Sequence, residues 1–282
     1  MNSPNRRDTH IAQRPSGLRF VAIIPALNEE ACIGRVVHAL RSLRRSDGTP
    51  AFAAVVVGDN GSTDQTCAQA LRAGALLGHA TSRGYGHGCM AAIAVAPAAD
   101  AYVFVDGDDT LNYAEIESLL TGIECGAQLV IGRRVHRAEH SMSALQVFGN
   151  ALCCALIRVL WGANVHDLGP LRAIRAPAFN RLDMQAFTYG WTLEMQVKAH
   201  ELHMNMVEVP VTTLARLVGH SKVSANVRAA ARCGRVMLQT IFTLWRTKRV
   251  RNGSPTWHPH LVNTFHPPRH VPDPTLKKEL PP

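Results

Sequence analysis

Residues 20–30 read FVAIIPALNEE, where five consecutive apolar positions end at a proline and a polar cluster. The run from Phe20 to Ile24 is rich in β-branched residues, which is typical of a strand covered on both faces. The same pattern recurs at residues 53–57 and 102–105. Segments with helical spacing separate these runs, so the sequence predicts a mainly parallel α/β sheet that binds ligands at the carboxyl ends of its strands.

Further elements follow from the same periodicities. Helices are predicted at residues 29–43, 64–73, 143–161, 192–202 and 224–245, with one more helix before residue 102, and strands at 128–131 and 206–211. The strand at 128–131 is expected to end at Gly132-Arg133-Arg134, and Pro210 places the last strand at a sheet edge. The helix at 143–161 is interpreted as buried, with membrane contact as the alternative, because no uninterrupted apolar run reaches the roughly 18 residues of a spanning helix.

Composition narrows the class of protein. The chain has 282 residues, 46% of them apolar, and a formal net charge of +9, which favours nucleotide phosphates, nucleic acid or an anionic membrane without choosing among them. Its seven cysteines form no CxxC pair, as expected for reduced thiols in an intracellular protein. Residues 1–19 are polar and basic and contain no apolar signal-peptide core, so we expect a cytoplasmic catalytic domain.

The chain is expected to divide into four parts. They are a flexible N-terminus at 1–18, a catalytic domain at 19–223, an amphipathic helix at 224–250 and a disordered tail at 251–282, where Pro, His and Lys replace any periodicity.

Residues 105–109 read VDGDD and place three carboxylates just past a buried strand. Carboxylates one residue apart on a turn, here Asp106 and Asp108, can chelate a hard divalent cation that bridges the diphosphate of a nucleotide-sugar. An Asp-rich turn that caps the next helix is the structural alternative.

A second polar cluster, GDNGSTD at residues 58–64, follows another predicted strand. Asp59 there can accept hydrogen bonds from a nucleotide base or ribose, and Asp64 can cap the following helix. Pro25 and Glu29, after the first strand, would border the same base pocket. A simple turn with a helix cap would also produce this pattern.

The glycine-rich stretch RGYGHG at residues 83–88 precedes an Ala-rich helix. Its backbone N–H groups could approach a phosphate closely, although a purely structural turn is the commoner use of such a stretch.

Taken in order, these motifs resemble the family-2 glycosyltransferases, in the branch of polyprenyl-phosphate sugar transferases similar to dolichyl-phosphate mannose or glucose synthases. The resemblance runs from about Phe20 to about Trp245. It rests on the series IPALNEE, GDNGSTD, RGYGHG, VDGDDT, IGRR, DLGPLRAIR, GWTLEMQVKA, EVPV and RLVGHSKVS. It implies a GT-A type (Rossmann-like) domain, a nucleotide-sugar donor and Mg²⁺ or Mn²⁺ as cofactor.

The resemblance also implies residue roles. Nucleotide-sugar binding is implied for Pro25, Leu27, Asn28, Glu29, Asp59, Asn60, Gly86, Asp106 and Gly107, with Asp106 and Asp108 as metal ligands. Catalytic roles are implied for Asp108, Asp167, Arg133 and Arg134, with Gly169 beside Asp167 in a loop near the sugar. The acceptor phosphate is implied to bind Arg216, Ser221 and Lys222, where arginine offers a planar fork and lysine a point charge.

The chain departs from the family pattern near its C-terminus. His220 and Ala225-Asn226 interrupt the acceptor motif, and the C-terminal transmembrane helices common in relatives are replaced by the predicted helix at 224–245. Cations follow that helix, so it is expected to lie at the cytoplasmic face of a membrane as a peripheral contact, or else to pack on the domain.

The expected function is inverting transfer of a hexose from a UDP- or GDP-sugar to a polyprenyl phosphate. A lipid phosphate is already anionic at neutral pH, since its second pKa is about 6, and needs no general base. A hydroxyl acceptor would need a carboxylate base, for which Asp167 and Glu194 are the candidates, although Glu194 is interpreted by default as an exposed helix residue.

Three alternatives stay open. Transfer to a soluble hydroxyl acceptor is the first, and nucleotidyl transfer is the second, although that chemistry expects a GxGTR-like loop where PALNEE stands. The third is a non-catalytic basic module for membranes or nucleic acid. Dispersed basic residues and an aromatic content of 6% argue against a nucleic-acid partner.

Overall fold

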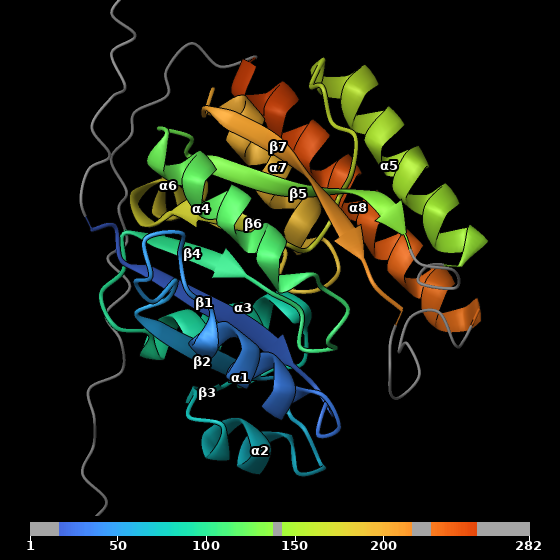
Figure 1. Cartoon of the computed structure of the whole chain (residues 1–282). Coiled ribbons are helices and arrows are strands. Elements are labelled where there is room, and N and C mark those ends of the chain that lie inside the picture. The colour runs from blue at the N-terminus through green and yellow to red at the C-terminus, as the bar shows by residue number, and fades with distance from the viewer. Residues whose placement is uncertain (1–16, 138–142, 216–226, 253–282) are drawn as a thin grey trace, which may run out of the picture.

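A seven-stranded sheet forms the centre of the structure, a computed structural model that describes residues 17–137, 143–215 and 227–252 (Figure 1). The strands are β1 (Phe20–Ala26), β2 (Ala54–Asp59), β3 (Leu76–His79), β4 (Ala101–Phe104), β5 (Leu129–Arg137), β6 (Arg172–Arg175) and β7 (Met206–Thr213). Their order is β3-β2-β1-β4-β6-β5-β7, and only β6 runs antiparallel to its neighbours. The mainly parallel α/β sheet predicted from the sequence is confirmed.

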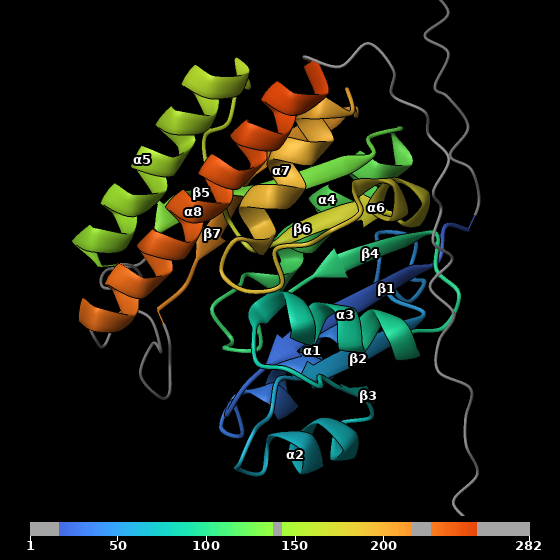
Figure 2. The same ribbon diagram turned by 180° about the vertical axis from the view of Figure 1, so that it is seen from behind.

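Helices cover both faces of this sheet (Figure 2). They are α1 (Ile33–Ser42), α2 (Thr66–Arg72), α3 (Tyr85–Val95), α4 (Ile116–Glu124), α5 (Ala144–Trp161), α6 (Ala176–Leu182), α7 (Trp191–Glu201) and α8 (Val227–Asn252), with a 3₁₀ turn at Tyr113–Glu115. One core cluster joins α1 and α4 to the sheet, and another joins α3, α6 and α7 to the opposite face.

The alternation of side chains along β1 explains its continuous apolar run. Phe20, Ala22 and Ile24 enter the cluster under α1 and α4, whereas Val21 and Ile23 enter the cluster under α3. All five are buried, so both faces of the strand are covered as the sequence predicts.

Several short elements were not predicted. The edge strand β3 and the antiparallel strand β6 have four residues each, and α6 has seven, so periodicity has little length in which to appear. The strand predicted to end at residue 131 instead continues to Arg137, because β7 pairs along its extra length. Arg133 and Arg134 therefore lie inside β5 and not in a loop after it.

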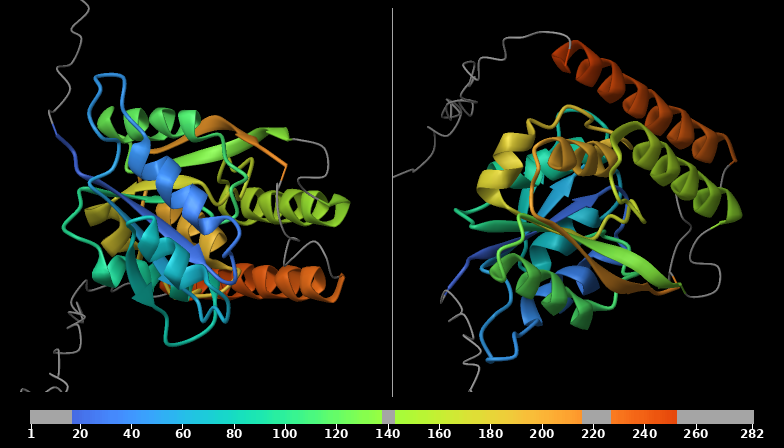
Figure 3. Two further views of the ribbon diagram at one scale, coloured as in Figure 1. Left: turned by 60° about the horizontal axis from the view of Figure 1, so that its bottom comes forward. Right: turned by 90° about the horizontal axis from the view of Figure 1, so that it is seen from above.

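Helices α5 and α8 pack against each other and against α7, and together they form a third hydrophobic cluster (Figure 3). The interpretation of α5 as a buried helix is wrong in part. Its Cys153, Cys154 and Ile157 are buried, but Phe148 and Val159 on another side are exposed. Among the described residues, α5 is the one helix long and apolar enough to cross a membrane by length and composition.

Some predictions fall outside the described residues. These include the acceptor segment with Arg216, Ser221 and Lys222, the domain boundary at residue 223, nearly all of the predicted N-terminal segment 1–18 and most of the tail 251–282. Within the described part, α8 continues to Asn252, beyond the periodic stretch that ends at residue 245 and two residues past the predicted amphipathic segment 224–250.

Candidate functional site

The polar residues predicted to form the site follow three adjacent strands. In the sheet, β1 lies between β2, which ends at Asp59, and β4, which precedes Asp106. Ala26 at the end of β1 pairs in register with Asp59, and the Val105 N–H donates to the Ile23 carbonyl on the other side. Two strand spacings of about 4.8 Å put Asp59 roughly 10 Å from the start of the Asp106 turn. The sheet thus brings these predicted residues to one edge.

Asp106 and Asp108 form the acidic part of this edge. Burial and the nearby charge of Asp108 together raise the pKa of Asp106 to about 7. Glu29 in the loop after β1 adds to the same rise, whereas Arg134 on β5 opposes it. Four charged side chains from the β1, β4 and β5 segments therefore interact electrostatically at one place.

Tyr85, in the first turn of α3, holds Asp106 in position. Its hydroxyl donates a hydrogen bond to Asp106 Oδ1 at 3.1 Å, and this bond lowers the pKa of the carboxyl against the larger effect of burial. Asp108 accepts from the Thr110 hydroxyl at 2.8 Å. Both predicted metal ligands are thus oriented by a neighbouring hydroxyl group.

The third carboxylate of the turn has a different role. Asp109 adopts a left-handed backbone conformation with φ of 60° and accepts from Tyr113 and from Arg35 of α1. These contacts hold the turn against α1, so Asp109 has a structural role in the loop.

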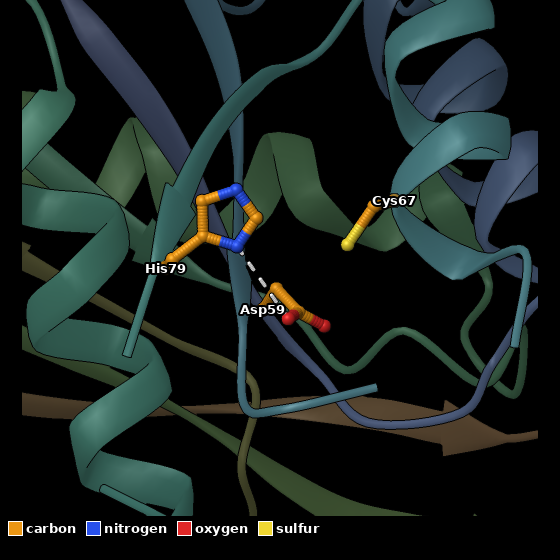
Figure 4. Close-up of side chains that lie close together, drawn as sticks. All are labelled: Asp59, Cys67 and His79. Carbon is orange, nitrogen blue, oxygen red and sulfur yellow. Dashed lines mark ion pairs between the residues drawn. The ribbon is translucent and has the colours of Figure 1, made fainter. Parts of the chain in front are cut away.

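Asp59 lies buried at the carboxyl end of β2 and pairs in register with His79 at the end of β3. Burial opposes its ionisation, but hydrogen bonds from Ser62 and Gly61 outweigh it and hold the pKa below the ordinary value. His79 Nδ1 lies 3.6 Å from Asp59 Oδ2, and the Cys67 thiol approaches from α2 (Figure 4). One donor atom from each of these three residues lies within 4.8 Å of the others.

The loop after β1 is tied to the loop after β2. The Asn28 side chain, at a residue with φ of 49°, accepts from the Thr63 N–H, and the Asn28 backbone N–H donates to the Ser62 hydroxyl oxygen. The Glu29 N–H likewise donates to the Thr66 hydroxyl. Pro25 and Leu27 in the same segment are half-buried, so the predicted base-binding residues belong to one connected unit.

Asn60 continues this unit toward α3. Its side-chain oxygen accepts the Gly84 N–H at 2.8 Å, which joins the loop after β2 to the glycine-rich stretch. Gly86 is packed tightly, because a Cβ there would lie 2.5 Å from the Trp191 ring and 2.7 Å from Phe187 Cα. Packing therefore accounts for this glycine, whereas a Cβ at the buried Gly107 would meet Ile33 and Ile24 at ordinary contact distances of 3.4 and 3.5 Å.

Arg134 and Asp167 form a bidentate ion pair next to the acidic turn. The Arg134 guanidinium donates through Nε and Nη2 to the two Asp167 oxygens at 2.8 and 2.7 Å, and the Arg134 backbone N–H adds a third bond. Asp167 is only 1% exposed. This geometry favours Asp167 as a positioning residue for Arg134 over a role as a free general base.

A second buried arginine, Arg172, supports the same loop. Its guanidinium donates to the carbonyls of Gly169 and Thr192, and Gln196 links to the Asp167 carbonyl. Burial lowers the pKa of Arg172 to about 10, which leaves it charged at neutral pH. A Cβ at Gly169 would lie 2.6 Å from the Gly132 carbonyl oxygen, so the loop passes β5 too closely for a side chain.

The other two candidate catalytic residues, Arg133 and Glu194, do not belong to the Arg134–Asp167 pair. Arg133 is half-buried and precedes Arg134 on β5, so strand alternation points it to the other face of the sheet. Glu194 is buried, which makes its interpretation as an exposed helix residue wrong. Its carboxylate accepts the N–H groups of Gln185 and Ala186 and pairs with Lys198, which fixes the segment before α7.

The donor set at Asp106 and Asp108 fits a hard divalent cation. Carboxylate oxygens are the ligands that Mg²⁺ and Mn²⁺ prefer, and a bound cation would offset both the burial of Asp106 and the nearby charge of Asp108, which together raise the pKa of Asp106. Asp59, Cys67 and His79 instead offer one oxygen, one sulfur and one nitrogen. That mixed set lies next to the loop predicted to hold the base and does not suit Mg²⁺.

Comparison with known proteins identifies the family. The model of the family described as "Glycosyl transferase family 2" matches residues 21–179, a span that contains the β1, β2 and β4 segments and the Asp167 loop. The chain belongs to glycosyl transferase family 2. The chain is 30% identical over 213 residues to the dolichyl-phosphate hexose transferase of Haloferax volcanii, covering 75% of this chain and 90% of the relative.

Further relatives of this family-2 glycosyltransferase agree with that assignment. The polyprenol monophosphomannose synthase of Mycolicibacterium smegmatis is 26% identical over 254 residues, covering 82% of this chain and 92% of the relative. A solved structure of glucosyl-3-phosphoglycerate synthase from Mycobacterium tuberculosis, in complex with Mn²⁺, UDP and phosphoglyceric acid, matches with a TM-score of 0.65. At 20% identity, with 81% of this chain and 79% of that chain covered, it shows the shared fold.

Four residues that lie at or beside the candidate site were not predicted from the sequence. Tyr85 lies within the RGYGHG stretch, where the glycines give a sequence signal but the tyrosine gives none; its role follows from its hydrogen bond to Asp106. Arg172 stood in the DLGPLRAIR motif without a stated role, and its burial gives the role. Cys67 and His79 are 12 residues apart and meet only because the unpredicted strand β3 pairs with β2.

Proposed function

We propose that this family-2 glycosyltransferase moves a hexose from a UDP- or GDP-sugar to a polyprenyl-phosphate-type lipid, with inversion at the anomeric carbon. The proposal rests on the contacts made by the two candidate general bases, Asp167 and Glu194. Asp167 is held by Arg134, and Glu194 is held by backbone N–H groups and Lys198. Because neither carboxylate is free to take a proton from a hydroxyl, a phosphate acceptor that is already ionised is favoured.

In this proposal the donor lies across the edge formed by β2, β1 and β4. The base is held between Asp59 with Asn60 and the segment Pro25–Glu29, and the diphosphate reaches the Asp106–Gly107–Asp108 turn. The separation of roughly 10 Å between the two acidic ends suits a nucleoside joined to a diphosphate. Binding across both ends fixes the orientation of the anomeric carbon.

Asp106 and Asp108 would hold Mg²⁺ or Mn²⁺, which when bound supplies positive charge to the leaving diphosphate. Arg134 adds a fixed positive charge beside Asp106, and Asp167 prevents the guanidinium from turning away. A charge that is oriented in advance stabilises a developing anion without reorganisation during the reaction.

The acceptor side is proposed from the sequence and from the relatives. Arg216, Ser221 and Lys222 would bind the acceptor phosphate, and transfer would proceed by direct in-line attack of its oxygen. The matched relatives from Haloferax volcanii and Mycolicibacterium smegmatis carry names that refer to dolichyl-phosphate and polyprenol acceptors or products, which supports a lipid acceptor here. A lipid acceptor also implies peripheral contact with the cytoplasmic face of a membrane.

A soluble phosphorylated acceptor is the second candidate. It is supported by the structural match to glucosyl-3-phosphoglycerate synthase, whose complex contains phosphoglyceric acid. Such an acceptor would make the same demands on the cationic residues but would not need a membrane.

The test is incubation of the full chain with radiolabelled UDP- and GDP-sugars, a short-chain polyprenyl phosphate and Mg²⁺ or Mn²⁺, with a chelator arm. Label is expected in the organic phase only with metal, and it should disappear in Asp108→Ala and Lys222→Ala. Asp100→Asn, at the opposite end of β4, is the matched control and should retain transfer. Label found solely on water-soluble products would overturn the lipid acceptor and leave the fold untouched.

A further inference from the structure

Helix α5 exposes a stripe of large apolar side chains on the side opposite its buried residues. Spacings of three, four and seven residues keep the stripe on one face of the helix. Its members, with their exposed fractions, are Leu145 (47%), Phe148 (64%), Leu152 (38%) and Val159 (81%). Large apolar side chains exposed along one helix face are a candidate interaction site.

Helix α8 packs beside α5 and exposes apolar and basic side chains of its own. Ile241 and Leu244 face the protein, and Leu238 and Phe242 are exposed on the other side. Arg235 flanks them, and the Arg246 guanidinium lies over the Phe242 ring at 5.5 Å. Over its length α8 contains six arginines, one lysine and no acidic residue.

We propose that the exposed faces of α5 and α8 form a docking surface for an anionic phospholipid bilayer, with α5 lying in the plane of the membrane interface. The stripe of α5 would enter the boundary between headgroups and acyl chains, and the α8 cations would contact the lipid phosphates. Apolar burial combined with basic residues is the pattern by which interfacial helices bind such surfaces. This inference deepens the proposed function, because it rests on a lipid acceptor and names the surface on which that acceptor is met.

An in-plane position follows from the packing of α5. Its Cys153, Cys154 and Ile157 belong to the cluster shared with α7 and α8, and α7 is packed on the central sheet. Crossing a bilayer would expose this buried face to lipid and pull α5 from its partners. The helix is about 27 Å long at 1.5 Å per residue, which provides an extended contact when it lies flat.

The charge distribution favours lipid over a second copy of the chain. A symmetric dimer through this surface would place the α8 cations of both copies against each other. An anionic bilayer instead neutralises them, and the attraction falls off within a Debye length and weakens with salt.

The orientation of the helices suits a membrane-bound acceptor. Both α5 and α8 begin on the side of the molecule toward which the arrows of β1, β5 and β7 point (Figures 1 and 2). This is the side that carries the Asp106 and Asp59 loops, because those loops follow the carboxyl ends of their strands. A bilayer docked on α5 and α8 would therefore lie beside the open edge of the site.

Vesicle flotation of the full chain tests the proposal in the absence of donor and acceptor. The probes are vesicles of phosphatidylcholine alone and of phosphatidylcholine mixed with phosphatidylglycerol. Binding is expected to the mixed vesicles and to weaken with added salt. Phe148→Glu and Val159→Glu should each reduce it by about tenfold or more, since each replaces apolar contact by charge. Leu71→Glu, at an exposed leucine on α2, is the matched control and should bind as the wild type does.

Three outcomes would overturn the proposal. Binding unchanged by Val159→Glu would exclude a contact along the length of α5. Resistance of the membrane-bound chain to alkaline carbonate extraction would show a spanning helix. Dimers in light scattering that Phe148→Glu converts to monomers, with vesicle binding unaffected, would assign the surface to self-association.

The variants also separate this inference from the proposed function. Phe148→Glu should keep its thermal unfolding midpoint and its transfer to a short-chain soluble acceptor while losing vesicle binding. If the wild type binds vesicles but transfers no sugar to any polyprenyl phosphate, the proposed function fails and the docking surface stands. If transfer occurs but vesicle binding is absent, the docking surface fails alone.

Discussion

Arg134 donates three hydrogen bonds to the Asp167 carboxylate, two from its guanidinium and one from its own backbone N–H. Asp167 is almost completely buried, and the Arg134 side chain is largely so. The pair connects β5 to the loop before β6 and fixes a positive charge beside Asp106. Its two members are therefore expected to act as one unit in both stability and transfer.

Asp167→Ala leaves the Arg134 guanidinium without its partner in a mostly buried position. Removing one member of a buried pair is expected to lower the free energy of unfolding by about 3–5 kcal/mol. Urea denaturation measures this loss, and kcat/KM should fall in parallel as the guanidinium loses its orientation. Asp100→Ala, which breaks the exposed pair with Arg19, should change the free energy of unfolding by about 1 kcal/mol at most. Equal costs for the two variants would show that the buried pair does not hold the site.

Tyr85→Phe removes the hydroxyl that donates to Asp106. Without that bond the pKa of Asp106 should rise further, and the carboxylate should be less firmly oriented. We expect the apparent affinity for Mn²⁺ to fall about 10- to 100-fold, the range typical for partners that orient metal ligands. Activation of transfer by Mn²⁺ and direct Mn²⁺ binding followed by electron paramagnetic resonance would both measure the change. Tyr102→Phe, whose ring packs against Phe179, is the control and should leave Mn²⁺ affinity as it is.

The sequence predicted the central strands because their signals are long and unambiguous. Five apolar residues in β1 can all be buried only if both faces of the strand are covered, and that alone implies helices on two sides. The helix predicted at 143–161 matches α5, whose start the structure shows to be stabilised by a capping box: the Ser143 hydroxyl accepts the Gln146 N–H and the Gln146 side chain accepts the Ser143 N–H.

What could not be predicted depends on tertiary contacts. β3 has four residues and one buried position, which is too short for an alternating pattern to be recognised in the sequence. It is identified as a strand only by its pairing with β2. The partners of Asp106 and Asp167 come from α3 and β5, far away in the chain. The sequence motifs predicted which residues form the candidate site. The contacts of Asp167 with Arg134, and of Glu194 with the backbone N–H groups before α7, became known only from the structure.

Cys67 is expected to react slowly with alkylating reagents. Burial and the charge of Asp59 raise the pKa of its thiol to about 11, so only a small fraction is the reactive thiolate at neutral pH. Alkylation by iodoacetamide should be slower than that of the exposed Cys125 and should accelerate as the pH rises toward 11. Asp59→Asn removes a like charge, which lowers the pKa and should speed the reaction at any pH below that value.

Peptide mass spectrometry after timed quenching measures each cysteine separately. UDP or GDP, whichever the enzyme uses, should protect Cys67 and leave Cys125 unprotected, because the base is proposed to lie against Asp59. Cys67 reacting as fast as Cys125 in the wild type would contradict the half-buried, negatively charged environment of its thiol. Protection of neither thiol would argue against a base at Asp59.

Gly58 and Gly34 should respond to alanine with opposite signs. At Gly58, in β2, a Cβ would lie 1.9 Å from the Gly88 carbonyl oxygen, so α3 would have to move away from the sheet. We expect Gly58→Ala to lower the free energy of unfolding by at least about 1–3 kcal/mol, the usual cost of overpacking. A Cβ at Gly34 in α1 would meet no other atom within 4 Å, and alanine there should stabilise the helix by about 0.5–1 kcal/mol. Chemical denaturation of both variants decides the matter: a Gly58→Ala protein as stable as the wild type would mean that α3 does not lie against β2 at backbone contact.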